Sequence, residues 1–193
     1  MNKTDATVLN GYVQRAFETS TASGFHKEYH PDQHWLMLVI TEICEAVEAD
    51  RKNKYVHLSP DTMSAFENAA NVSDEAFKTE FEAWIKNRVE DELADVVIRL
   101  CDYAGTTGIE LKESSVYADH DYFVNLTFTE TAYDLTKHLI FDASFLDAMD
   151  HILPDIIQYV YDWADYLGAD LDWYIHQKMR YNEMRSQMHG KKY

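Results

Sequence analysis

Apolar residues recur every three or four positions along most of the chain, which is the spacing of an amphipathic helix. The pattern predicts a first helix over residues 5–20 and a second over 32–52, opened by Pro31 at a position that favours proline. Residues 53–71 are the least regular stretch, and there we expect a connector with one short helix. The first third of the chain is therefore predicted to be helical.

The longest apolar stripe predicts one continuous helix over residues 73–104, ended by Gly105. After a polar stretch, the pattern predicts three more helices, over residues 122–141, 144–167 and 170–188. Pro154 should break or kink the second of these, because proline removes a helical hydrogen bond. No segment alternates as a strand does, so the sequence predicts an all-α helical bundle, with residues 1–193 in a single domain.

The charge of the chain is one-sided, since 17 Lys and Arg stand against 34 Asp and Glu, a net charge of −17. Such a surface repels both the phosphate backbone and anionic lipids, so we expect neither nucleic acid nor a membrane as a partner. The two cysteines, Cys44 and Cys101, are too few for a disulfide scaffold. No secretory signal or spanning segment stands out, so a cytoplasmic protein is expected.

Two parts of the chain resemble each other weakly. Six residues recur at a fixed offset, as Leu93/Leu153, Asp95/Asp155, Asp102/Asp162, Ala104/Ala164, Gly108/Gly168 and Leu111/Leu171. Upstream, Leu38, Thr41 and Glu42 match Leu126, Thr129 and Glu130. The second copy has Tyr133 and Ile152 where the first has Glu45 and Glu92, so it lacks two carboxylates. A true duplication and a shared helical composition both account for this match.

Four carboxylates stand in two pairs within the apolar stripes. Glu42 and Glu45 are three residues apart, as are Glu92 and Asp95, so each pair lies on one side of its helix. Charges about 4 Å apart repel by roughly 4 kcal/mol at an effective dielectric constant of 20, so protons or cations must offset the repulsion. Oxygen ligands suit Mg²⁺, with Mn²⁺ as a substitute. The alternative is four solvated carboxylates. No Glu-x-x-His motif occurs, which disfavours a di-iron site.

The Glu-x-x-Glu motif at 42–45, followed by Glu-x-x-Asp at 92–95, resembles the MazG-like, all-α nucleoside triphosphate pyrophosphohydrolases. Near the carboxyl end, Lys178, Asn182 and Arg185 match the Lys-x3-Asn-x2-Arg segment of that family. The chain departs from the family pattern at Thr41, where a glutamate is common, and in its longer spacer between the two motifs.

The resemblance implies Mg²⁺-dependent hydrolysis of a nucleoside triphosphate, with a deoxynucleotide favoured, to a monophosphate and pyrophosphate. It implies that the metal ligands are Glu42, Glu45, Glu92 and Asp95. It also implies that Glu45 or Glu42 accepts the proton of the attacking water, and that the residues contacting phosphate are Lys178, Asn182 and Arg185. Aromatic residues that are candidates to stack on the base are His34, Trp35, Trp173 and Tyr181.

Combined with the repeat, the resemblance predicts a fused pseudo-dimer with one composite site. Residues 1–111 would form the catalytic half with the metal ligands, and residues 112–193 a degenerate half that contributes the phosphate-binding residues. The rival hypothesis is a catalytically inactive nucleotide-binding bundle or an acidic interaction protein. A homodimer of the whole chain is compatible with either.

Overall fold

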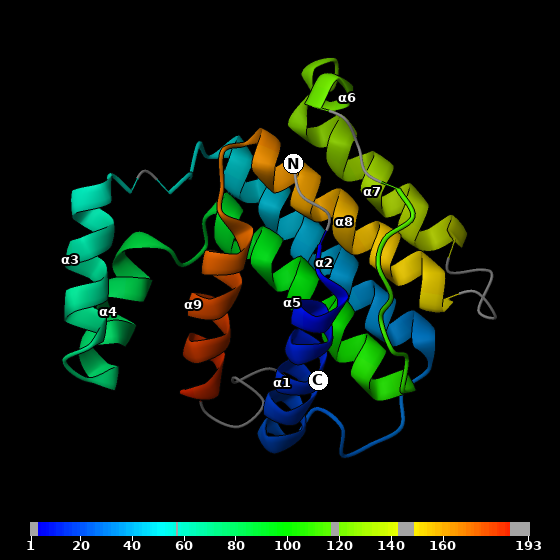
Figure 1. The fold of residues 1–193 in the computed structure, drawn as a ribbon, viewed down its shortest axis with the longest axis horizontal. Coiled ribbons are helices and arrows are strands. Elements are labelled where there is room, and N and C mark those ends of the chain that lie inside the picture. The colour runs from blue at the N-terminus through cyan, green and yellow to red at the C-terminus, as the bar shows by residue number, and fades with distance from the viewer. Residues whose placement is uncertain (1–3, 57, 117–119, 143–148, 186–193) are drawn as a thin grey trace.

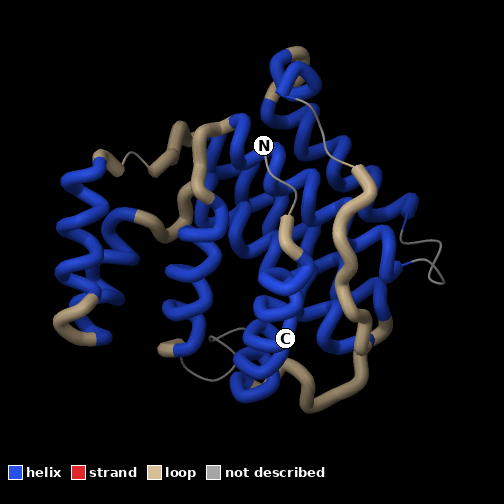
Figure 2. Tube along the Cα trace, viewed as in Figure 1, coloured by secondary structure: helices blue, strands red, loops and turns tan. Residues whose placement is uncertain are grey.

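The computed structural model describes residues 4–56, 58–116, 120–142 and 149–185, and within these ranges it contains helices and no strands (Figure 2). The helices are α1 (Ala6–Ser23), α2 (Asp32–Arg51), α3 (Pro60–Ala70), α4 (Asp74–Trp84), α5 (Val89–Thr107), α6 (His120–Val124), α7 (Phe128–Asp142), α8 (Met149–Tyr166) and α9 (Leu171–Glu183). The prediction of an all-α bundle is confirmed. None of the described helices is long and apolar enough to cross a membrane.

Helix α5 lies at the centre of the molecule, and α1, α2, α8 and α9 all pack against it (Figure 1). Fourteen of its 19 residues are buried. A helix surrounded in this way normally carries apolar residues on every face. Helix α5 instead buries several carboxylates, Glu90, Asp91, Glu92 and Asp102, within the core. The centre of the fold is therefore also the place where acidic groups are concentrated.

The helices of the two matching stretches form two pairs that lie against each other. Helices α2 and α5 belong to the first stretch, and α7 and α8 to the second. Helix α2 packs beside α7, and α5 packs beside α8 (Figure 1). This is the arrangement that a duplicated helix pair would give, although the duplication stays a hypothesis.

The predicted continuous helix over residues 73–104 is wrong, because the chain turns between α4 and α5. Asn87 has a left-handed backbone (φ 58°), which asparagine adopts more readily than most residues. Its N–H group donates to Asp91 Oδ2 at 2.9 Å, so the side chain of Asp91 holds the turn. Helix α4 therefore leaves the bundle and packs with α3 and α9 (Figure 1).

Two further helix boundaries differ from the predictions. The expected helix over residues 122–141 is split into α6 and α7, and a capping box begins α7: Thr127 N–H donates to Glu130, and Glu130 N–H donates to Thr127 Oγ1. Helix α8 continues through Pro154, so of the expected break or kink the break does not occur. Pro154 is the sixth residue of α8 and lacks the N–H group that would donate to the carbonyl group of Asp150. The lost hydrogen bond therefore lies in the first turns of the helix. Parts of the predicted helices 144–167 and 170–188 lie outside the described residues.

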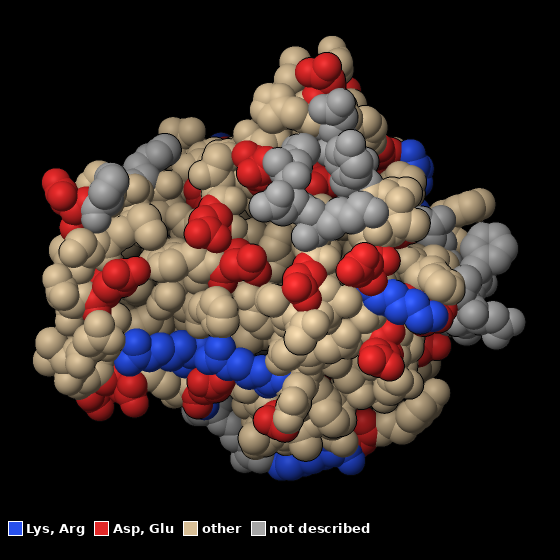
Figure 3. All heavy atoms as spheres, viewed as in Figure 1, with Lys and Arg blue, Asp and Glu red and all other residues tan. Residues whose placement is uncertain are grey.

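Charged side chains are spread over the surface. On the face drawn in Figure 3, acidic residues are scattered over many elements rather than gathered into one patch. The surface charge itself therefore marks no single binding site on that face.

Gly105 fixes how closely α1 approaches α5. A Cβ atom added at Gly105 would lie 2.6 Å from Phe17 Cβ, whereas a Cβ atom at Gly11, within α1, would meet no atom within 4 Å. We predict that Gly105→Ala lowers the free energy of unfolding by about 1–3 kcal/mol, because the two helices must separate. Gly11→Ala is the control and should raise it by roughly 0.5–1 kcal/mol, since alanine favours the helix. Urea unfolding of both variants measures the difference, and equal values would contradict the close approach.

Candidate metal and phosphate site

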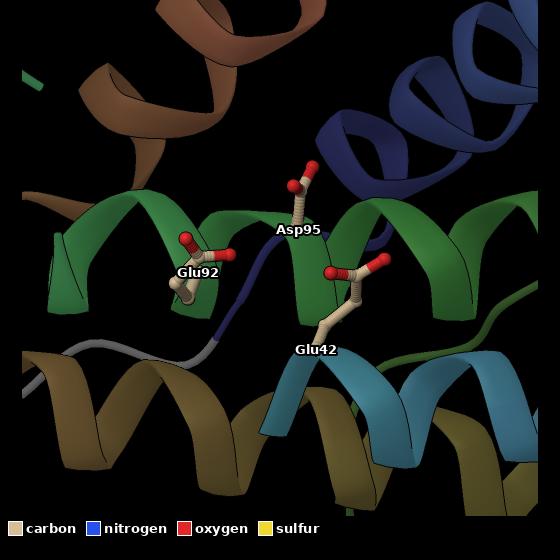
Figure 4. Close-up of side chains that lie close together, drawn as sticks. All are labelled: Glu42, Glu92 and Asp95. Carbon is tan, nitrogen blue, oxygen red and sulfur yellow. The ribbon is translucent and has the colours of Figure 1, made fainter. Parts of the chain in front are cut away.

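Three of the four predicted carboxylates converge at the contact between α2 and α5. One oxygen atom from each of Glu42, Glu92 and Asp95 lies within 4.8 Å of the others. Figure 4 shows Glu92 and Asp95 rising from α5 and Glu42 from the neighbouring α2. Glu42 and Glu92 are buried and Asp95 is half-buried. No other group of acidic, histidine or cysteine ligands converges in this way among the described residues.

The structure does not bring Glu45 into this group. Its side chain is exposed on α2, although its charge is close enough to contribute to a raised pKa at Glu92. Glu45 therefore lies at the edge of the site, where solvent reaches it.

The electrostatics of the site favour a bound cation. Burial, followed by the charges of Asp91 and Asp95, raises the pKa of Glu92 to about 9, although Lys178 opposes the shift. Glu92 is consequently protonated at neutral pH unless a cation replaces the proton. The same carboxyl group in the unfolded chain loses its proton near pH 4.5. A divalent cation would remove the repulsion and release the proton.

Lys178 reaches this group from α9, near the carboxyl end of the chain. Its Nζ atom lies 2.8 Å from Asp91 Oδ1 and 2.8 Å from Asp95 Oδ2, and only 5% of the residue is exposed. Burial lowers the pKa of Lys178, but Asp91, Asp95 and Glu92 raise it by more, so the ammonium group stays charged. Lys178 thus neutralises and orients the carboxylates, and its predicted contact with phosphate stays a prediction.

The other two residues of the carboxyl-terminal motif line a small cavity next to the carboxylates. This cavity has a volume of about 50 Å³, and the polar residues lining it include Glu42, Asp95, Arg99, Asp102, Asn182 and Arg185. Arg185 Nη1 donates to Asn182 Oδ1 at 3.4 Å. Elements from both ends of the chain therefore meet at one place, as the composite-site hypothesis requires.

Two residues of the site were missed by sequence reasoning. Arg99 Nε donates to Glu42 Oε1 at 3.0 Å, so a guanidinium group offsets the charge of that carboxylate. Asp91 holds Lys178, as described above. Both lie four residues from Asp95 on α5, one on each side, and this spacing places them on the same helix face. Their four-residue separation from Asp95 is the signal by which the sequence could have identified Asp91 and Arg99.

The second copy of the repeat uses its carboxylates differently. Asp155, the counterpart of Asp95, accepts hydrogen bonds from Ser114 Oγ at 2.7 Å and from Ser115 N–H at 2.8 Å. Glu130, the counterpart of Glu42, caps α7. Both groups hold the chain in place, so the second copy offers no comparable cluster within the described residues.

Compared with protein-family models, curated proteins and solved structures, the chain gives no match. An assignment to a family therefore depends on the residues of the site themselves.

We predict that the pH dependence of stability reports the proton on Glu92. In the absence of divalent cations, the folded state keeps this proton between about pH 4.5 and 9 while the unfolded state loses it. The free energy of unfolding should therefore fall as the pH rises through this range, by up to about 1.4 kcal/mol per unit from this group. Thermal melts of Glu92→Gln should show a smaller slope, and those of Glu67→Gln, a change at an exposed residue of α3, the slope of the unaltered protein.

Addition of Mg²⁺ should reverse this loss, because the cation displaces the proton. At about one hundred times its dissociation constant it would add roughly 2.7 kcal/mol, with a larger effect at pH 8 than at pH 6. Glu92→Gln should lose most of the stabilisation. Melting curves that Mg²⁺ leaves unchanged at both pH values would contradict a cation site.

Removing Lys178 should be strongly destabilising. Lys178→Met leaves the buried carboxylate of Asp91 without its cation, which we expect to cost about 3–5 kcal/mol in unfolding free energy. Lys52→Met removes the exposed pair with Glu48, 2.8 Å apart, and should cost less than about 1 kcal/mol. Urea unfolding at pH 7 compares the two variants, and a similar small cost for both would show that the buried pair contributes little.

Proposed function

We propose that the chain is a Mg²⁺-dependent nucleoside triphosphate pyrophosphohydrolase of the MazG-like kind, which hydrolyses a deoxynucleoside triphosphate to a monophosphate and pyrophosphate. One observation carries this proposal: Glu42, Glu92 and Asp95 converge, and Glu42 and Asp95 line a cavity together with Asn182 and Arg185. Acidic ligands for a metal, a guanidinium group and an amide group thus face one small volume.

The donor set fits Mg²⁺. Three carboxylates from two helices supply only oxygen atoms, and Mg²⁺ binds through one or two carboxylates together with waters and substrate phosphates. The raised pKa of Glu92 points in the same direction, because the cluster needs a positive charge to ionise fully. When bound, Mg²⁺ would lower the pKa of a water molecule and offset the charge of the triphosphate, and Mn²⁺ would substitute for it.

Residues of the chain would then fix the metal ligands, accept the proton of water and bind phosphate. Arg99 holds Glu42 through the 3.0 Å hydrogen bond, and Lys178 holds Asp95, so both ligands are fixed before the substrate arrives. Glu45 is exposed beside them and suits the role of general base, with Glu42 as the second candidate. Arg185 offers a planar fork of donors for phosphate oxygens, and Asn182 a further polar contact.

The reaction itself balances with these groups. The oxygen atom of water bonds to the α-phosphorus, and the anhydride bond between the α- and β-phosphates breaks. The water proton passes to the glutamate. Pyrophosphate leaves with the electrons of the broken bond, and its charge would be offset by the cationic side chains.

The second candidate function is that of a catalytically inactive nucleotide-binding or acidic interaction bundle. Two observations favour the acidic interaction bundle. The cavity of about 50 Å³ is small beside the roughly 300–1,000 Å³ of most ligand sites. The ammonium group of Lys178 is already bound by Asp91 and Asp95. An active enzyme would have to open the cavity when the substrate binds.

Pyrophosphate release from a panel of deoxynucleoside triphosphates in the presence of Mg²⁺ tests the proposed function. Asp95→Asn should lower kcat/KM by at least about 100-fold, because a metal ligand loses its charge. Asp155→Asn is the matched control from the second copy and should keep activity within about threefold. No release above that of Asp95→Asn would favour the inactive bundle.

The same assay separates the general base from the metal ligands. Glu45→Gln should lower kcat by about 10²–10⁴-fold. It should leave the stabilisation by Mg²⁺ intact, because Glu45 lies outside the converging group. Loss of both the activity and the stabilisation by Mg²⁺ would indicate that Glu45 is a metal ligand.

A further inference from the structure

Arg99 lies where a cation entering the carboxylate group would meet it. Its Nε atom donates to Glu42 Oε1 at 3.0 Å, and the side chains of Arg99 and Glu42 are only 17% and 4% exposed. Glu42, Asp95 and Arg99 line the same cavity of about 50 Å³. A cation that binds Glu42 and Asp95 from this cavity therefore comes close to the guanidinium group, and the two positive charges repel each other.

Asp102 offers Arg99 a second acceptor. It follows Arg99 by three residues on α5, so the two side chains lie on one side of the helix, about 4.5 Å apart along its axis. Asp102 lines the same cavity, and only 3% of the residue is exposed. Its Oδ1 atom accepts hydrogen bonds from Ser20 Oγ at 2.5 Å and from His26 Nε2 at 2.9 Å. Its Oδ2 atom is enclosed and has no hydrogen-bond partner in the part of the chain that the structure describes.

The guanidinium group therefore lies between a carboxylate that it binds and one that lacks a partner. Burial lowers the pKa of Arg99, but the charges of Glu42, Asp95 and Asp102 raise it by more, so Arg99 lies within the field of all three groups. A guanidinium group carries five N–H donors, and the bond through Nε uses one of them. Because an enclosed carboxylate oxygen without a donor is rare and costly, a bond from Arg99 to Asp102 would remove an unfavourable feature of the structure.

Lys178, the other cation at these carboxylates, is placed differently. Its Nζ atom lies 2.8 Å from Asp91 Oδ1 and 2.8 Å from Asp95 Oδ2, and Lys178 is not among the residues that line the cavity. Of the two cations, Arg99 is thus the one that faces the volume through which a metal ion would bind.

We propose that Arg99 is an exchangeable counter-ion of the metal site: it binds Glu42 while the site holds no metal ion, and transfers to Asp102 when a divalent cation binds. This inference rests on the proposed function, because it describes how the metal site of that enzyme changes when it is loaded. With the charge of Glu42 offset by Mg²⁺, the guanidinium group is repelled there and satisfies Oδ2 of Asp102 instead. Arg99 is therefore a positioning residue, which lowers the affinity for the cation, whereas Asp102 raises it.

Calorimetric titration with Mg²⁺ at pH 8 tests the exchange without turnover. Arg99→Met should lower the Kd for Mg²⁺ at least about fivefold, because no guanidinium group competes for Glu42. Asp102→Asn should raise the Kd at least about fivefold, because the displaced guanidinium group finds no charged acceptor. Asp162→Asn, the equally buried counterpart in the second copy, is the control and should leave the Kd unchanged. A higher Kd in Arg99→Met would show that Arg99 only holds Glu42 in place, and would overturn the proposal.

The double variant separates the exchange from a direct attraction between Asp102 and the metal ion. In Arg99→Met, the further change Asp102→Asn should have no effect on the Kd, because Asp102 acts through Arg99. A loss of affinity that persists without Arg99 would mean that Asp102 attracts the cation directly, and would reject the exchange.

Nuclear magnetic resonance follows the guanidinium group in the unaltered protein. Without Mg²⁺, the Nε–H proton of Arg99 should show Overhauser contacts with the side-chain protons of Glu42, and saturating Mg²⁺ should replace them by contacts with those of Asp102. Contacts with Glu42 that persist in saturating Mg²⁺ would reject the exchange and leave the metal site standing. Absence of any Mg²⁺ binding in the titration would instead reject the metal site, and with it both the proposed hydrolase and the exchange.

Discussion

The compensation of buried negative charge on α5 is the interaction on which the rest of the structure depends. A central helix that buries Asp91, Glu92 and Asp102 is stable only if cations or protons offset their charges. Lys178 supplies one cation from α9, Arg99 supplies another from α5 itself, and a proton on Glu92 removes a third charge. The folded chain thus already holds part of the positive charge that a metal ion would bring.

This compensation links the ends of the chain to its centre. Because Lys178 must reach Asp91 and Asp95, helix α9 is held against α5, and Asn182 and Arg185 follow on the same helix or directly after it. The ion pairs that help to form the site therefore also hold α9 against α5. Asp91 takes part twice, since it also holds Asn87 in the turn that sends α4 away from the bundle.

Sequence reasoning found what depends on local spacing. The helices α1 and α2, the short helix after Pro60 and the facing carboxylates all follow from it. The turn at Asn87 was missed because Phe77, Phe81 and Val89 continue one apolar stripe across it, so the pattern shows no interruption. Glu45 was expected among the ligands, but it is exposed on α2 whereas Glu42 is buried. Glu92 and Asp95 have the same spacing and both converge, so the spacing alone does not decide which residues of a pair face the site. The pairing of Lys178 with Asp91 joins distant parts of the chain, and no local pattern reveals it.

The hydrogen bonds that Asp155 accepts from Ser114 and Ser115 give this aspartate a different role from that of Asp95 in the first half of the bundle. In one half Asp95 lines a cavity and pairs with Lys178, whereas in the other Asp155 binds the connecting segment that joins the halves. A carboxylate cluster like that of Glu42, Glu92 and Asp95 could form in the second half only if Asp155 first released that connector. The segment that connects the two halves thus also limits the proposed metal site to one of them.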